Sequence, residues 1–405
     1  MTTGLLWPQQ VRSVAEDEPR DIVIVGGGVS AHRCAFDLRR NGYRGNLTLI
    51  SKEMYAPYDR TLLSKDMLYD AESAELVLLS EPDRYREAGI DLRLGLTADW
   101  LDADQRCIGL NDGSTRSFDR LVLSVGGSPI LPPALDASGV LMVREAAGLS
   151  GLRQAMVPGT HMVVIGGGFI GGEVAAAATQ LDVEVTLVEA AAQPLATVLG
   201  EKVGARVAAL HRDRGVKVLT GAAANTVTAT GKGFEVRFPD GARLAADSVV
   251  VGVGMRPNTD WLLESGIDID RGIITDANCR TSADPVFAAG DCARWWHPRY
   301  SELCRVEHWD TANRHGAAVA KAVLGEEQSF APLPFFWSDQ CGVKFQFAGR
   351  AQSWDEVRVE GDSPSQFAAR YYTSGNLTGV LVAGQPRVFA DLRRELAAGA
   401  AEVRS

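Results

Sequence analysis

Two stretches of the chain repeat the same order of apolar and polar positions. Each begins with a short run of β-branched apolar residues, as in a buried parallel strand, and continues through glycines into a helical pattern and a second apolar run. This order predicts two strand–turn–helix–strand units of an α/β fold. The expected strands are residues 21–25 and 47–50 in the first unit and residues 161–165 and 183–188 in the second, with helices over 29–40 and 173–180.

The turn of the first unit reads G-x-G-x-x-A, a pattern that suits the pyrophosphate of a dinucleotide. Gly26 permits the tight turn, Gly28 lets the backbone approach the pyrophosphate, and Ala31 lets the helix pack close to the strand. Free N–H groups at the start of the helix then face the phosphates. Ser30, in the same turn, is also expected to lie at the cofactor.

The turn of the second unit is a full G-x-G-x-x-G, made by Gly166, Gly168 and Gly171, with Ile170 between the last two. A single copy of this motif is weak evidence, because glycine turns join strands to helices in many sheets. Two copies, each in a complete unit, make a mere turn a poor explanation. Two dinucleotide sites in one chain indicate one cofactor held permanently and one that exchanges, as in a flavoprotein reductase.

An acidic residue past each glycine motif indicates which dinucleotide is bound. Glu189 stands at the end of the strand after the second motif, where a carboxylate can accept a hydrogen bond from a ribose 2′-hydroxyl. No arginine follows it to meet a 2′-phosphate, so NADH is expected rather than NADPH. After the first motif, Glu53 is expected to hold the adenosine ribose of FAD, although Lys52 stands where an acid would suit better.

Three more strand-like runs end in glycine and support a flavin site. They cover residues 121–127, 248–258 and 286–291. The second contains Gly254, which is expected near a cofactor. The third ends in Gly290-Asp291, and Asp291 can accept a hydrogen bond from a ribityl hydroxyl of FAD. A turn aspartate after a strand would be an ordinary alternative if this residue stood alone.

Composition changes the picture mainly by exclusion. A chain of 405 residues, 46% of them hydrophobic, has room for two or three domains with sizeable cores. Its net charge of −10 argues against general nucleic-acid binding. The sequence has no apolar run of about 18 residues and no signal pattern, so we expect no membrane span and a cytoplasmic location.

The six cysteines do not form a recognisable site. No two of them stand in a C-x-x-C or a similar close pair, so neither a zinc site nor a redox disulfide is indicated, and no bound metal is expected. We expect reduced cysteines that are mostly packed in the interior, as free cysteines usually are.

Six local motifs of the chain occur together in one known family. Residues 57–65 resemble P-Y-x-R-P-P-L-S-K and residues 334–340 resemble P-x-F-W-S-D-Q; the others are residues 166–173, 257–259, 290–291 and 305–313. They resemble the two-dinucleotide flavoprotein family that includes glutathione reductase. Within it, the chain is most similar to the FAD-dependent NADH:ferredoxin reductases of bacterial oxygenase and P450 systems, of the putidaredoxin reductase and biphenyl dioxygenase ferredoxin reductase type. The resemblance covers nearly all of residues 20–400.

The resemblance implies roles for particular residues toward FAD and NADH. Arg60 and Lys65 would contact FAD, and Lys65 would pair with Glu173 beside the isoalloxazine ring. Trp337 would lie near the flavin and the nicotinamide. Lys65, Glu173 and Trp337 are therefore the expected catalytic residues. Hydride would pass from NADH to the flavin, with the protein supplying placement and electrostatics.

Two further segments follow from the resemblance. The segment of Glu307, His308 and Trp309 would bring a backbone N–H to the flavin, where it would stabilise the negative charge of the reduced ring. Thr61-Leu62 stands where the family has two prolines. This departure is expected to loosen the loop before Lys65.

The resemblance also implies an α/β architecture of two Rossmann-like, glutathione-reductase-like dinucleotide-binding domains and a C-terminal α+β interface domain. The FAD domain would be split between residues 1–114 and 245–325, with the NAD domain, residues 115–244, inserted. The last domain would cover residues 326–405. Within it we expect strands at 335–337, 344–348, 368–373 and 377–382 and a helix over 386–398.

The implied electron acceptor is a [2Fe-2S] ferredoxin that binds transiently and feeds an oxygenase or a cytochrome P450, with the reductase a monomer or weak dimer. Two alternatives stay open: a rubredoxin reductase, and an NADH oxidase or signalling flavoprotein without a protein acceptor. The stretch of residues 62–65 contains no cysteine, which argues against thiol chemistry.

A basic, aromatic-rich segment favours a protein acceptor over the last alternative. Residues 294–299 read R-W-W-H-P-R and follow Gly290-Asp291, with Arg305 and Arg314 close behind. On an acidic protein such a surface would attract an acidic ferredoxin. An ordinary exposed loop with a packed tryptophan pair is the alternative explanation.

Overall fold

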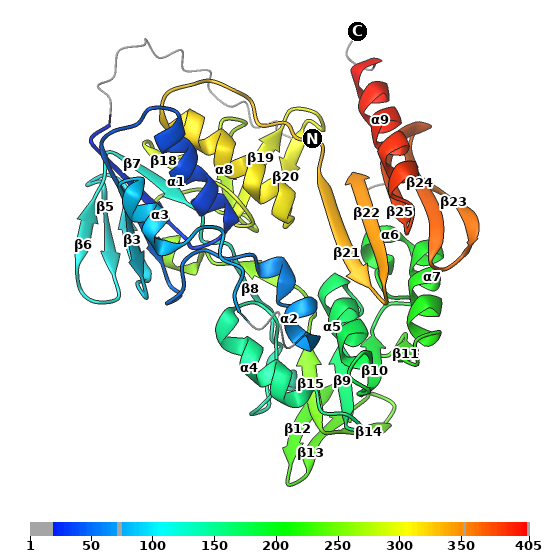
Figure 1. The fold of residues 1–405 in the computed structure, drawn as a ribbon. Coiled ribbons are helices and arrows are strands. Elements are labelled where there is room, and N and C mark those ends of the chain that lie inside the picture. The colour runs from blue at the N-terminus through cyan, green and yellow to red at the C-terminus, as the bar shows by residue number, and fades with distance from the viewer. Residues whose placement is uncertain (1–18, 71–74, 351–353, 403–405) are drawn as a thin grey trace, which may run out of the picture.

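A parallel sheet carries the first glycine turn (Figure 1). The computed structural model describes residues 19–70, 75–350 and 354–402. The order across the sheet is β18 (Val286–Ala288), β7 (Arg120–Leu123), β1 (Asp21–Val25), β2 (Asn46–Ser51) and β3 (Ile90–Leu94). Between β1 and β2 runs α1 (Val29–Arg40), with the bounds that the apolar spacing predicts.

The expected apolar face of α1 is buried in the core of this domain. Ala31, Ala35 and Leu38 are all fully buried, together with Ile24 and Leu49 of the sheet. A second helix, α8 (Trp309–Val323), packs against α1 (Figure 1). The two helices approach closely because α8 presents a glycine: a Cβ at Gly316 would lie 2.3 Å from the carbonyl oxygen of Ser30.

A second parallel sheet carries the second glycine turn. Its order is β11 (Lys217–Thr220), β10 (Glu184–Glu189), β9 (His161–Ile165) and β15 (Ser248–Val251). The helix after the turn, α5 (Phe169–Thr179), begins four residues before the expected position because Gly171 and Gly172 are helical. The two predicted dinucleotide-binding units are thus confirmed as elements of the fold.

Sheet pairing corrects the expected domain boundaries. The boundary between residues 114 and 115 assigns β7 to the NAD domain, yet β7 pairs in parallel with β1. The boundary between residues 244 and 245 assigns β15 to the FAD domain, yet β15 pairs with β9. Both strands are short apolar runs without a local signal for the sheet that they join, so the sequence alone placed them wrongly.

The C-terminal part is an antiparallel sheet with one helix against it, to the right in Figure 1. Its order is β21 (Phe335–Gln340), β22 (Val343–Gly349), β25 (Asn376–Ala383), β24 (Gln366–Thr373) and β23 (Glu356–Ser363). The helix is α9 (Pro386–Glu402). The four expected strands and the helix are confirmed. β23 was missed although Val357 and Val359 alternate with charged residues, because the alternation is short and the rest of the strand is exposed and polar.

The remaining elements are short. The further helices of the described chain are α2 (Asp66–Tyr69), α3 (Pro82–Glu87), α4 (Ala146–Ala155), α6 (Ala196–Leu199) and α7 (Glu201–Arg212), with 3₁₀ turns at Arg60–Leu62, Pro133–Leu135 and Asp260–Leu262. Small sheets are formed by β4 (Ala98–Asp102), β5 (Cys107–Leu110) and β6 (Thr115–Ser117); by β12 (Thr226–Thr230), β13 (Gly233–Arg237) and β14 (Arg243–Ala246); by β8 (Gly127–Pro129) and β16 (Met255–Pro257); and by β17 (Ile273–Thr275), β19 (Ala293–His297) and β20 (Glu302–Cys304).

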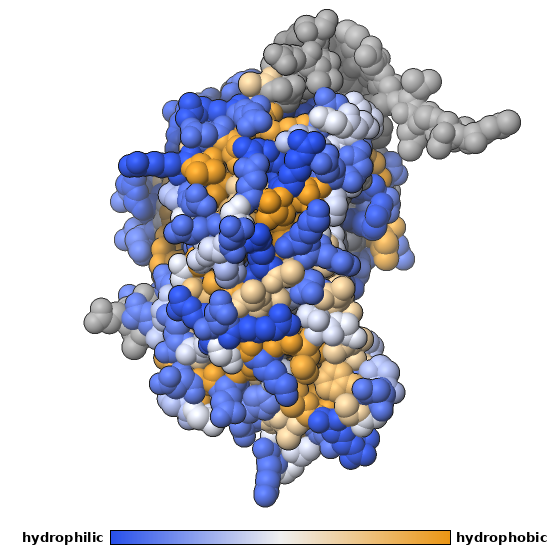
Figure 2. All heavy atoms as spheres, turned by 90° about the vertical axis from the view of Figure 1, so that its right-hand side faces the viewer, coloured by the Kyte–Doolittle hydropathy of each residue, from blue (hydrophilic) through white to orange (hydrophobic). Residues whose placement is uncertain are grey.

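The surface is predominantly polar on the face that carries the C-terminal sheet. Figure 2 shows hydrophilic residues over most of this face, with apolar residues in smaller patches between them. In the part of the chain that the structure describes, no helix combines the length and the apolar character needed to cross a membrane.

Candidate functional site

The first glycine turn forms an open cradle at the carboxyl end of β1. Gly26 has a φ of +134°, and a Cβ there would lie 2.0 Å from the carbonyl oxygen of Ser124, so only glycine fits. At Gly28, which caps α1, nothing lies within 4 Å of the Cβ position. Ser30 is buried in the first turn of the helix, with its Oγ 3.4 Å from Ser124 Oγ. The free N–H groups of α1 therefore face a space that can hold a pyrophosphate.

The second turn repeats this geometry. Gly166 has a φ of +108° and would place a Cβ 2.3 Å from the carbonyl oxygen of Gly252, while Gly168 again faces open space at the start of α5. A Cβ at Gly171 would lie 2.0 Å from the carbonyl oxygen of Gly166, so this glycine lets the helix pack against the turn. Ile170 is 43% exposed at the mouth of the cradle.

Glu189 closes the second cradle at its strand end. Its Oε2 accepts a hydrogen bond from the N–H of Gly167 at 2.7 Å, and its Oε1 accepts one from the N–H of Ala191, also at 2.7 Å. The carboxylate is thereby fixed beside the glycine turn, where an adenosine ribose would lie. Gly254 has a φ of +129° beyond β15, and its carbonyl oxygen accepts a hydrogen bond from the N–H of Ile130.

The two units differ at the position of Glu189. The N–H of Gly26 donates to Ile50, and the N–H of Gly166 donates to Val188, so the counterpart of Glu189 is Ser51. Ser51 faces its glycine turn: a Cβ at Gly27 would lie 2.1 Å from Ser51 Oγ. Glu53, expected at the ribose, lies two residues further on and has other partners, so it does not occupy the strand-end position.

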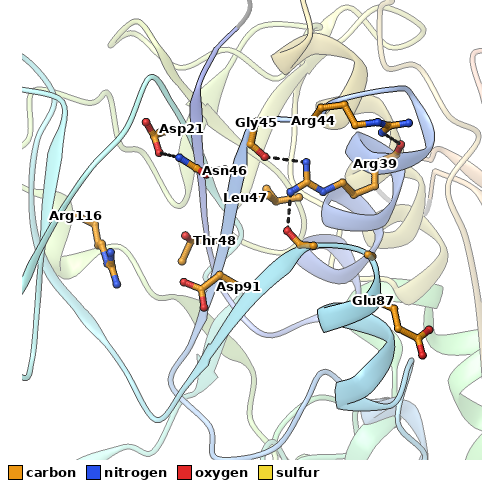
Figure 3. A pocket seen from close by; sticks show the side chains of 12 residues that line it. Asp21, Arg39, Arg44, Gly45, Asn46, Leu47, Thr48, Glu87, Asp91 and Arg116 are labelled. Atoms are coloured by element: carbon orange, nitrogen blue, oxygen red, sulfur yellow. Dashed lines mark hydrogen bonds between the residues drawn. The ribbon is translucent and has the colours of Figure 1, made fainter.

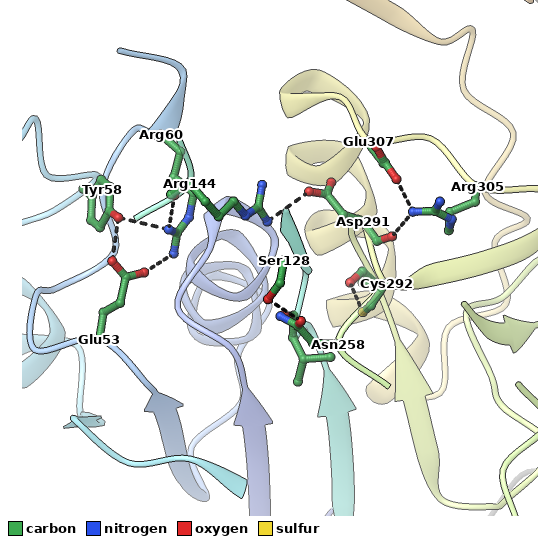
Figure 4. A network of polar contacts seen from close by, with 12 residues as sticks. Glu53, Tyr58, Arg60, Ser128, Arg144, Asn258, Asp291, Cys292, Arg305 and Glu307 are labelled. Carbon is green, nitrogen blue, oxygen red and sulfur yellow. Dashed lines mark hydrogen bonds and ion pairs between the residues drawn. The ribbon is translucent and has the colours of Figure 1, made fainter. Parts of the chain in front are cut away.

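Glu53 instead anchors the loop that leads to Lys65 (Figure 4). It forms an ion pair with Arg60, and its Oε2 accepts a hydrogen bond from the Tyr58 hydroxyl at 2.6 Å. Arg60 also donates to the carbonyl oxygen of Arg144 at 3.0 Å. These contacts fix the guanidinium of Arg60 between Glu53 and the carbonyl oxygen of Arg144.

The loop at Thr61-Leu62 is held by hydrogen bonds, and the expectation that it is looser than a loop with two prolines stays a prediction. Residues Arg60–Leu62 form a 3₁₀ turn that Asp59 caps, because its Oδ1 accepts from both the N–H and the hydroxyl of Thr61, at 2.9 and 2.7 Å. The Thr61 carbonyl oxygen accepts from Lys65 Nζ at 2.9 Å. Thr61 thus connects the cap of the turn at Asp59 to the ammonium of Lys65.

Lys65 and Glu173 form a buried ion pair that joins the two units. Lys65 Nζ lies 3.0 Å from Glu173 Oε2, with side-chain exposures of 11% and 3%. Glu173 stands in the first turns of α5, directly after the second glycine turn. Its carboxylate also accepts hydrogen bonds from the hydroxyls of Ser64 and Ser338, at 2.5 and 2.6 Å. The sequence-predicted pair is thus brought together between the two cradles.

Asp291 stands at the end of the first sheet, as expected, and the structure adds an arginine to it. Arg144 Nη2 lies 3.4 Å from Asp291 Oδ2, and Arg305 donates to the Asp291 carbonyl oxygen at 3.4 Å (Figure 4). Arg305 is also paired with Glu307. Burial raises the pKa of Glu307, and the neighbouring Arg305 opposes that rise.

The start of α8 presents polar groups that the protein leaves unpaired. His308 caps this helix, and Trp309 is its first residue. His308 Nδ1 and Trp309 Nε1 are both buried, and neither has a hydrogen-bond partner among the described residues. Burial lowers the pKa of His308 to about 4, so the ring is neutral near pH 7. Unpaired polar groups at a helix N-terminus, among them the N–H donor of Trp309, are suited to the electron-rich edge of a flavin.

Trp337 completes the aromatic side of this region. Its ring centroid lies 6.1 Å from that of Trp309 and 6.0 Å from that of Phe335. Together the two open cradles, the pair of Lys65 and Glu173 and the unpaired start of α8 fit two dinucleotides whose redox-active ends would meet between the domains.

The predicted exit surface at residues 294–299 is wrong in its aromatic part. These residues are largely in β19 rather than in a loop, and alternate side chains point inward: Trp295 and His297 are fully buried, whereas Trp296 is 46% exposed. Arg294 is paired with Asp270. One tryptophan of the pair therefore belongs to the core, and the charge of Arg294 is already neutralised.

A cleft of about 780 Å³ lies away from these groups, at the amino ends of β1 and β2 (Figure 3). Arg39 on its wall donates to the carbonyl oxygens of Tyr43, Gly45 and Gly89 at 2.9, 2.9 and 2.7 Å. Ligands of parallel α/β sheets bind at the carboxyl ends of the strands, so this cleft is not the cofactor site. No cluster of three or more metal-ligating side chains occurs in the described ranges of the chain.

Several residues of the site were not found from the sequence. Arg144 lies just before α4 in a segment without a motif, and only the fold brings it to Asp291. Ser338 and Gln340 lie within a motif, and the alternation of β21 could have identified them as inward-facing. His211 looks like any residue of an amphipathic helix, and no local signal marks it.

Comparison with known proteins identifies relatives along nearly the whole chain. The model of the pyridine nucleotide-disulphide oxidoreductase family matches residues 20–316, and a model described as reductase C-terminal matches residues 335–404. The ferredoxin–NAD(+) reductase subunit of the benzene 1,2-dioxygenase system of Pseudomonas putida is 35% identical over 91% of this chain and 90% of its own. The corresponding component of the anthranilate 1,2-dioxygenase system of Burkholderia cepacia is 35% identical over 93% of this chain and 94% of its own.

Solved structures show the same architecture. The covalent complex of putidaredoxin reductase with putidaredoxin superimposes with a TM-score of 0.88 at 30% identity, over 94% of this chain and 93% of that chain. A water-forming NADH oxidase of Lactobacillus brevis superimposes with a TM-score of 0.80 at 19% identity, over 89% of this chain and 86% of that chain. The second likeness concerns the fold alone.

Proposed function

The chain belongs to the pyridine nucleotide-disulphide oxidoreductase family, and we propose that it passes electrons from NADH through FAD to a [2Fe-2S] ferredoxin that feeds an oxygenase or a cytochrome P450. One NADH gives up a hydride, two ferredoxins each accept one electron, and one proton is released. When bound, FAD accepts the two electrons of NADH together and can pass them on one at a time. The residues of the chain bind, orient and charge the groups around it.

The observation that carries this proposal is the chemistry around Lys65 and Glu173. The side chains that form hydrogen bonds with this pair among the described residues carry hydroxyls, those of Ser64 and Ser338, and not thiols. The neighbour of Asp291, Cys292, is fully buried and donates to the carbonyl oxygens of Leu123 and Ala289. Burial raises the pKa of the Cys292 thiol to about 11, so it is not a nucleophile near pH 7. Among the described residues, no thiol contacts this pair, which supports the transfer of single electrons without a disulfide step.

Each cradle has its own task in this proposal. The N–H groups at Gly28 would hold the pyrophosphate of FAD, with Asp291 at the ribityl chain. The N–H groups at Gly168 would hold the pyrophosphate of NADH, with Glu189 at the adenosine ribose. Because Glu189 is fixed by two backbone N–H groups, its negative charge cannot move away from a 2′-phosphate, which supports NADH over NADPH.

Lys65, Glu173 and Trp337 are proposed to act at the reacting end. Lys65 would place its ammonium at the flavin edge and favour the electron-rich reduced state, while Glu173 limits how far that charge acts. The start of α8 at His308 and Trp309 would donate to the opposite edge. Arg60 would contact FAD, and Glu53 would orient Arg60 rather than the ribose.

The exit for electrons is proposed at a face made by Trp309, Phe335, Trp337 and Arg393, the Trp337 face. Arg393 lies 5.0 Å over the ring of Phe335, and none of the described carboxylates forms an ion pair with it. A shallow cleft of about 610 Å³ opens beside it, between Phe335 and Phe389. An acidic ferredoxin would find an unneutralised positive charge over aromatic rings here.

The test is stopped-flow and steady-state kinetics with purified protein. We expect bound FAD that NADH reduces, followed by reduction of a [2Fe-2S] ferredoxin much faster than of a rubredoxin or of oxygen. A matched pair of variants checks the cradle. Gly28→Val should fold and fail to retain FAD, whereas Gly168→Val should retain FAD and lose reduction by NADH. Oxygen reduction faster than the reduction of any ferredoxin would favour the NADH oxidase alternative. Rubredoxin reduction faster than ferredoxin reduction would favour the rubredoxin reductase alternative.

A monomeric or weakly dimeric state, a cytoplasmic location and the absence of nucleic-acid binding stay predictions from the sequence. Light scattering of the FAD-loaded protein over a range of concentrations tests the first of them.

A further inference from the structure

A chain of buried hydrogen bonds runs from α7 to the pair of Lys65 and Glu173. His211 on α7 is fully buried, and its Nε2 lies 2.9 Å from Gln340 Oε1. Gln340 Nε2 donates to Ser338 Oγ at 3.0 Å, and Ser338 Oγ donates to Glu173 Oε1 at 2.6 Å. The chain links a helix of the second unit, the C-terminal strand β21 and α5. Glu173 was expected from the sequence, whereas His211, Gln340 and Ser338 were not.

The donors of these hydrogen bonds all point the same way. An amide oxygen can only accept, so His211 must carry its proton on Nε2 and leave Nδ1 as an acceptor, which faces Cys341 Sγ at 3.6 Å. Because Gln340 donates to Ser338 Oγ, the single proton of Ser338 points to Glu173. Every donor in the chain therefore points toward the Glu173 carboxylate.

The imidazole at the head of the chain is neutral. Burial lowers the pKa of His211, and the bond to Gln340 opposes this only in part. His211 therefore contributes an oriented dipole and no net charge. Lys65 stays the one cation in hydrogen-bond contact with Glu173 among the described residues, and the position of its ammonium depends on where the carboxylate is held.

A glycine makes room for this arrangement. A Cβ at Gly172 would lie 2.4 Å from Gln340 Oε1 and 2.8 Å from its Cδ, so α5 can approach the amide only because the residue before Glu173 is glycine. The amide of Gln340 is thus held from two sides, by the close backbone of α5 and by the ring of His211. This second observation is independent of the hydrogen bonds.

We propose that His211 is a positioning residue for hydride transfer: through Gln340 and Ser338 it fixes the Glu173 carboxylate and so the place of the Lys65 ammonium. This inference rests on the proposed function, because the pair acts on hydride transfer only if FAD is bound beside it. Without the His211 donor, the Gln340 amide is free to turn and present its oxygen to Ser338. The Ser338 proton would then point to Gln340, and Glu173 would lose one of its donors.

The central experiment compares His211→Phe with His211→Gln. Phenylalanine keeps a ring and removes the donor, whereas the Nε2 of glutamine can stand near the position of the imidazole Nε2. At saturating NADH, we expect His211→Phe to reduce flavin about tenfold more slowly, the effect of one hydrogen bond. His211→Gln should recover to within about twofold of the unmodified protein. The Kd for NADH should stay unchanged in both, because neither variant touches the second cradle.

Leu210→Ala is the matched control, since Leu210 is the buried neighbour of His211 on α7 and takes no part in the hydrogen bonds that lead to Glu173. It should lower the thermal midpoint and leave the rate of flavin reduction unchanged. Equal slowing in Leu210→Ala and His211→Phe would mean that His211 acts only by packing and would overturn the proposal. So would a failure of His211→Gln to recover the rate.

A second readout does not use FAD. In apoprotein with ¹⁵N-labelled histidine, the signal that disappears in His211→Phe should report a neutral ring protonated on Nε2. A ring protonated on Nδ1 could not donate to Gln340, and a charged ring would not be a neutral dipole, so either result would refute the inference. If instead the unmodified protein lacks NADH-reducible FAD, the proposed function fails, whatever the tautomer of His211.

Discussion

Replacing Lys65 by methionine removes one charge from the junction of the two units and keeps an unbranched side chain that is one atom shorter. Lys65 Nζ lies 3.0 Å from Glu173 Oε2 and 2.9 Å from the Thr61 carbonyl oxygen. Because Glu173 is only 3% exposed, water cannot replace the lost ammonium. The carboxylate keeps the hydroxyl donors of Ser64 and Ser338 but loses its counter-charge.

The magnitude follows from this arrangement. Removing one partner of a buried ion pair typically costs about 3–5 kcal/mol, because a charge is left uncompensated. Because two hydroxyl donors to Glu173 remain, we expect Lys65→Met to lower the free energy of unfolding by roughly 2–3 kcal/mol, at or below the lower end of that range. In domains of this size about 1 kcal/mol corresponds to a shift of about 2–4 °C in the thermal midpoint, so the apoprotein should melt roughly 5–10 °C lower.

A double-variant cycle tests the reasoning. Glu173→Gln in the Lys65→Met background removes the unpaired charge, so the double variant should recover most of the lost stability. Flavin reduction by NADH should stay slow in both single variants and in the double variant, because the ammonium is displaced or absent in each. Thermal unfolding of the apoproteins gives the first result, and stopped-flow reduction gives the second. A Lys65→Met midpoint within about 1 °C of the unmodified protein, or a double variant as unstable as Lys65→Met, would refute the buried-pair account.

Three further predictions address the other parts of the molecule. Glu189→Ala should narrow the preference for NADH over NADPH, by the roughly 1–3 kcal/mol of one hydrogen bond or repelled pair; equal kcat/KM for the two cofactors in the unmodified protein would contradict this. Arg393→Glu should slow ferredoxin reduction at low salt and leave hydride transfer unchanged. Arg294→Glu should slow ferredoxin reduction less, because Arg294 is already paired with Asp270; a larger effect of Arg294→Glu would place the electron exit near Arg294 instead. Burial lowers the pKa values of His308 and His315 to about 4 and about 3, below the unfolded 6.5. The free energy of unfolding of the apoprotein should therefore fall as the pH falls from about 6.5 toward about 4, by up to about 1.4 kcal/mol per pH unit for each histidine. When the free energy of unfolding is measured with urea at several pH values, it should depend less steeply on pH in His315→Phe.

Local patterns were sufficient where structure is decided locally. The bounds of α1 and β9 match those expected, because β-branched runs, glycine turns and helical spacing lie next to one another in the sequence. The sheet to which a short apolar strand belongs is decided by distant partners. This is why β7 and β15 were assigned to the wrong domains.

The same distinction holds within the site. Gly26, Gly28, Gly166 and Gly168 were found because their motif states what the backbone must do. Arg144 was missed because nothing near it in sequence requires an arginine. The error at Trp295 was avoidable, since reading residues 293–297 with the period of a strand places Trp295 inside and Trp296 outside.

Strand β21 changes what the C-terminal domain contributes. Its burial alternates, so Ser338 and Gln340 point inward while Phe335 and Trp337 are on the opposite, partly exposed side. The inward side supplies a donor to Glu173, and the outward side supplies the aromatic part of the Trp337 face. Trp337 was expected from this domain, and the structure adds Ser338 of the same strand as a hydrogen-bond donor to Glu173. Because successive residues of a strand point to opposite faces, one strand can serve hydride entry and electron exit at once, and a shift of one residue in its register would disturb both.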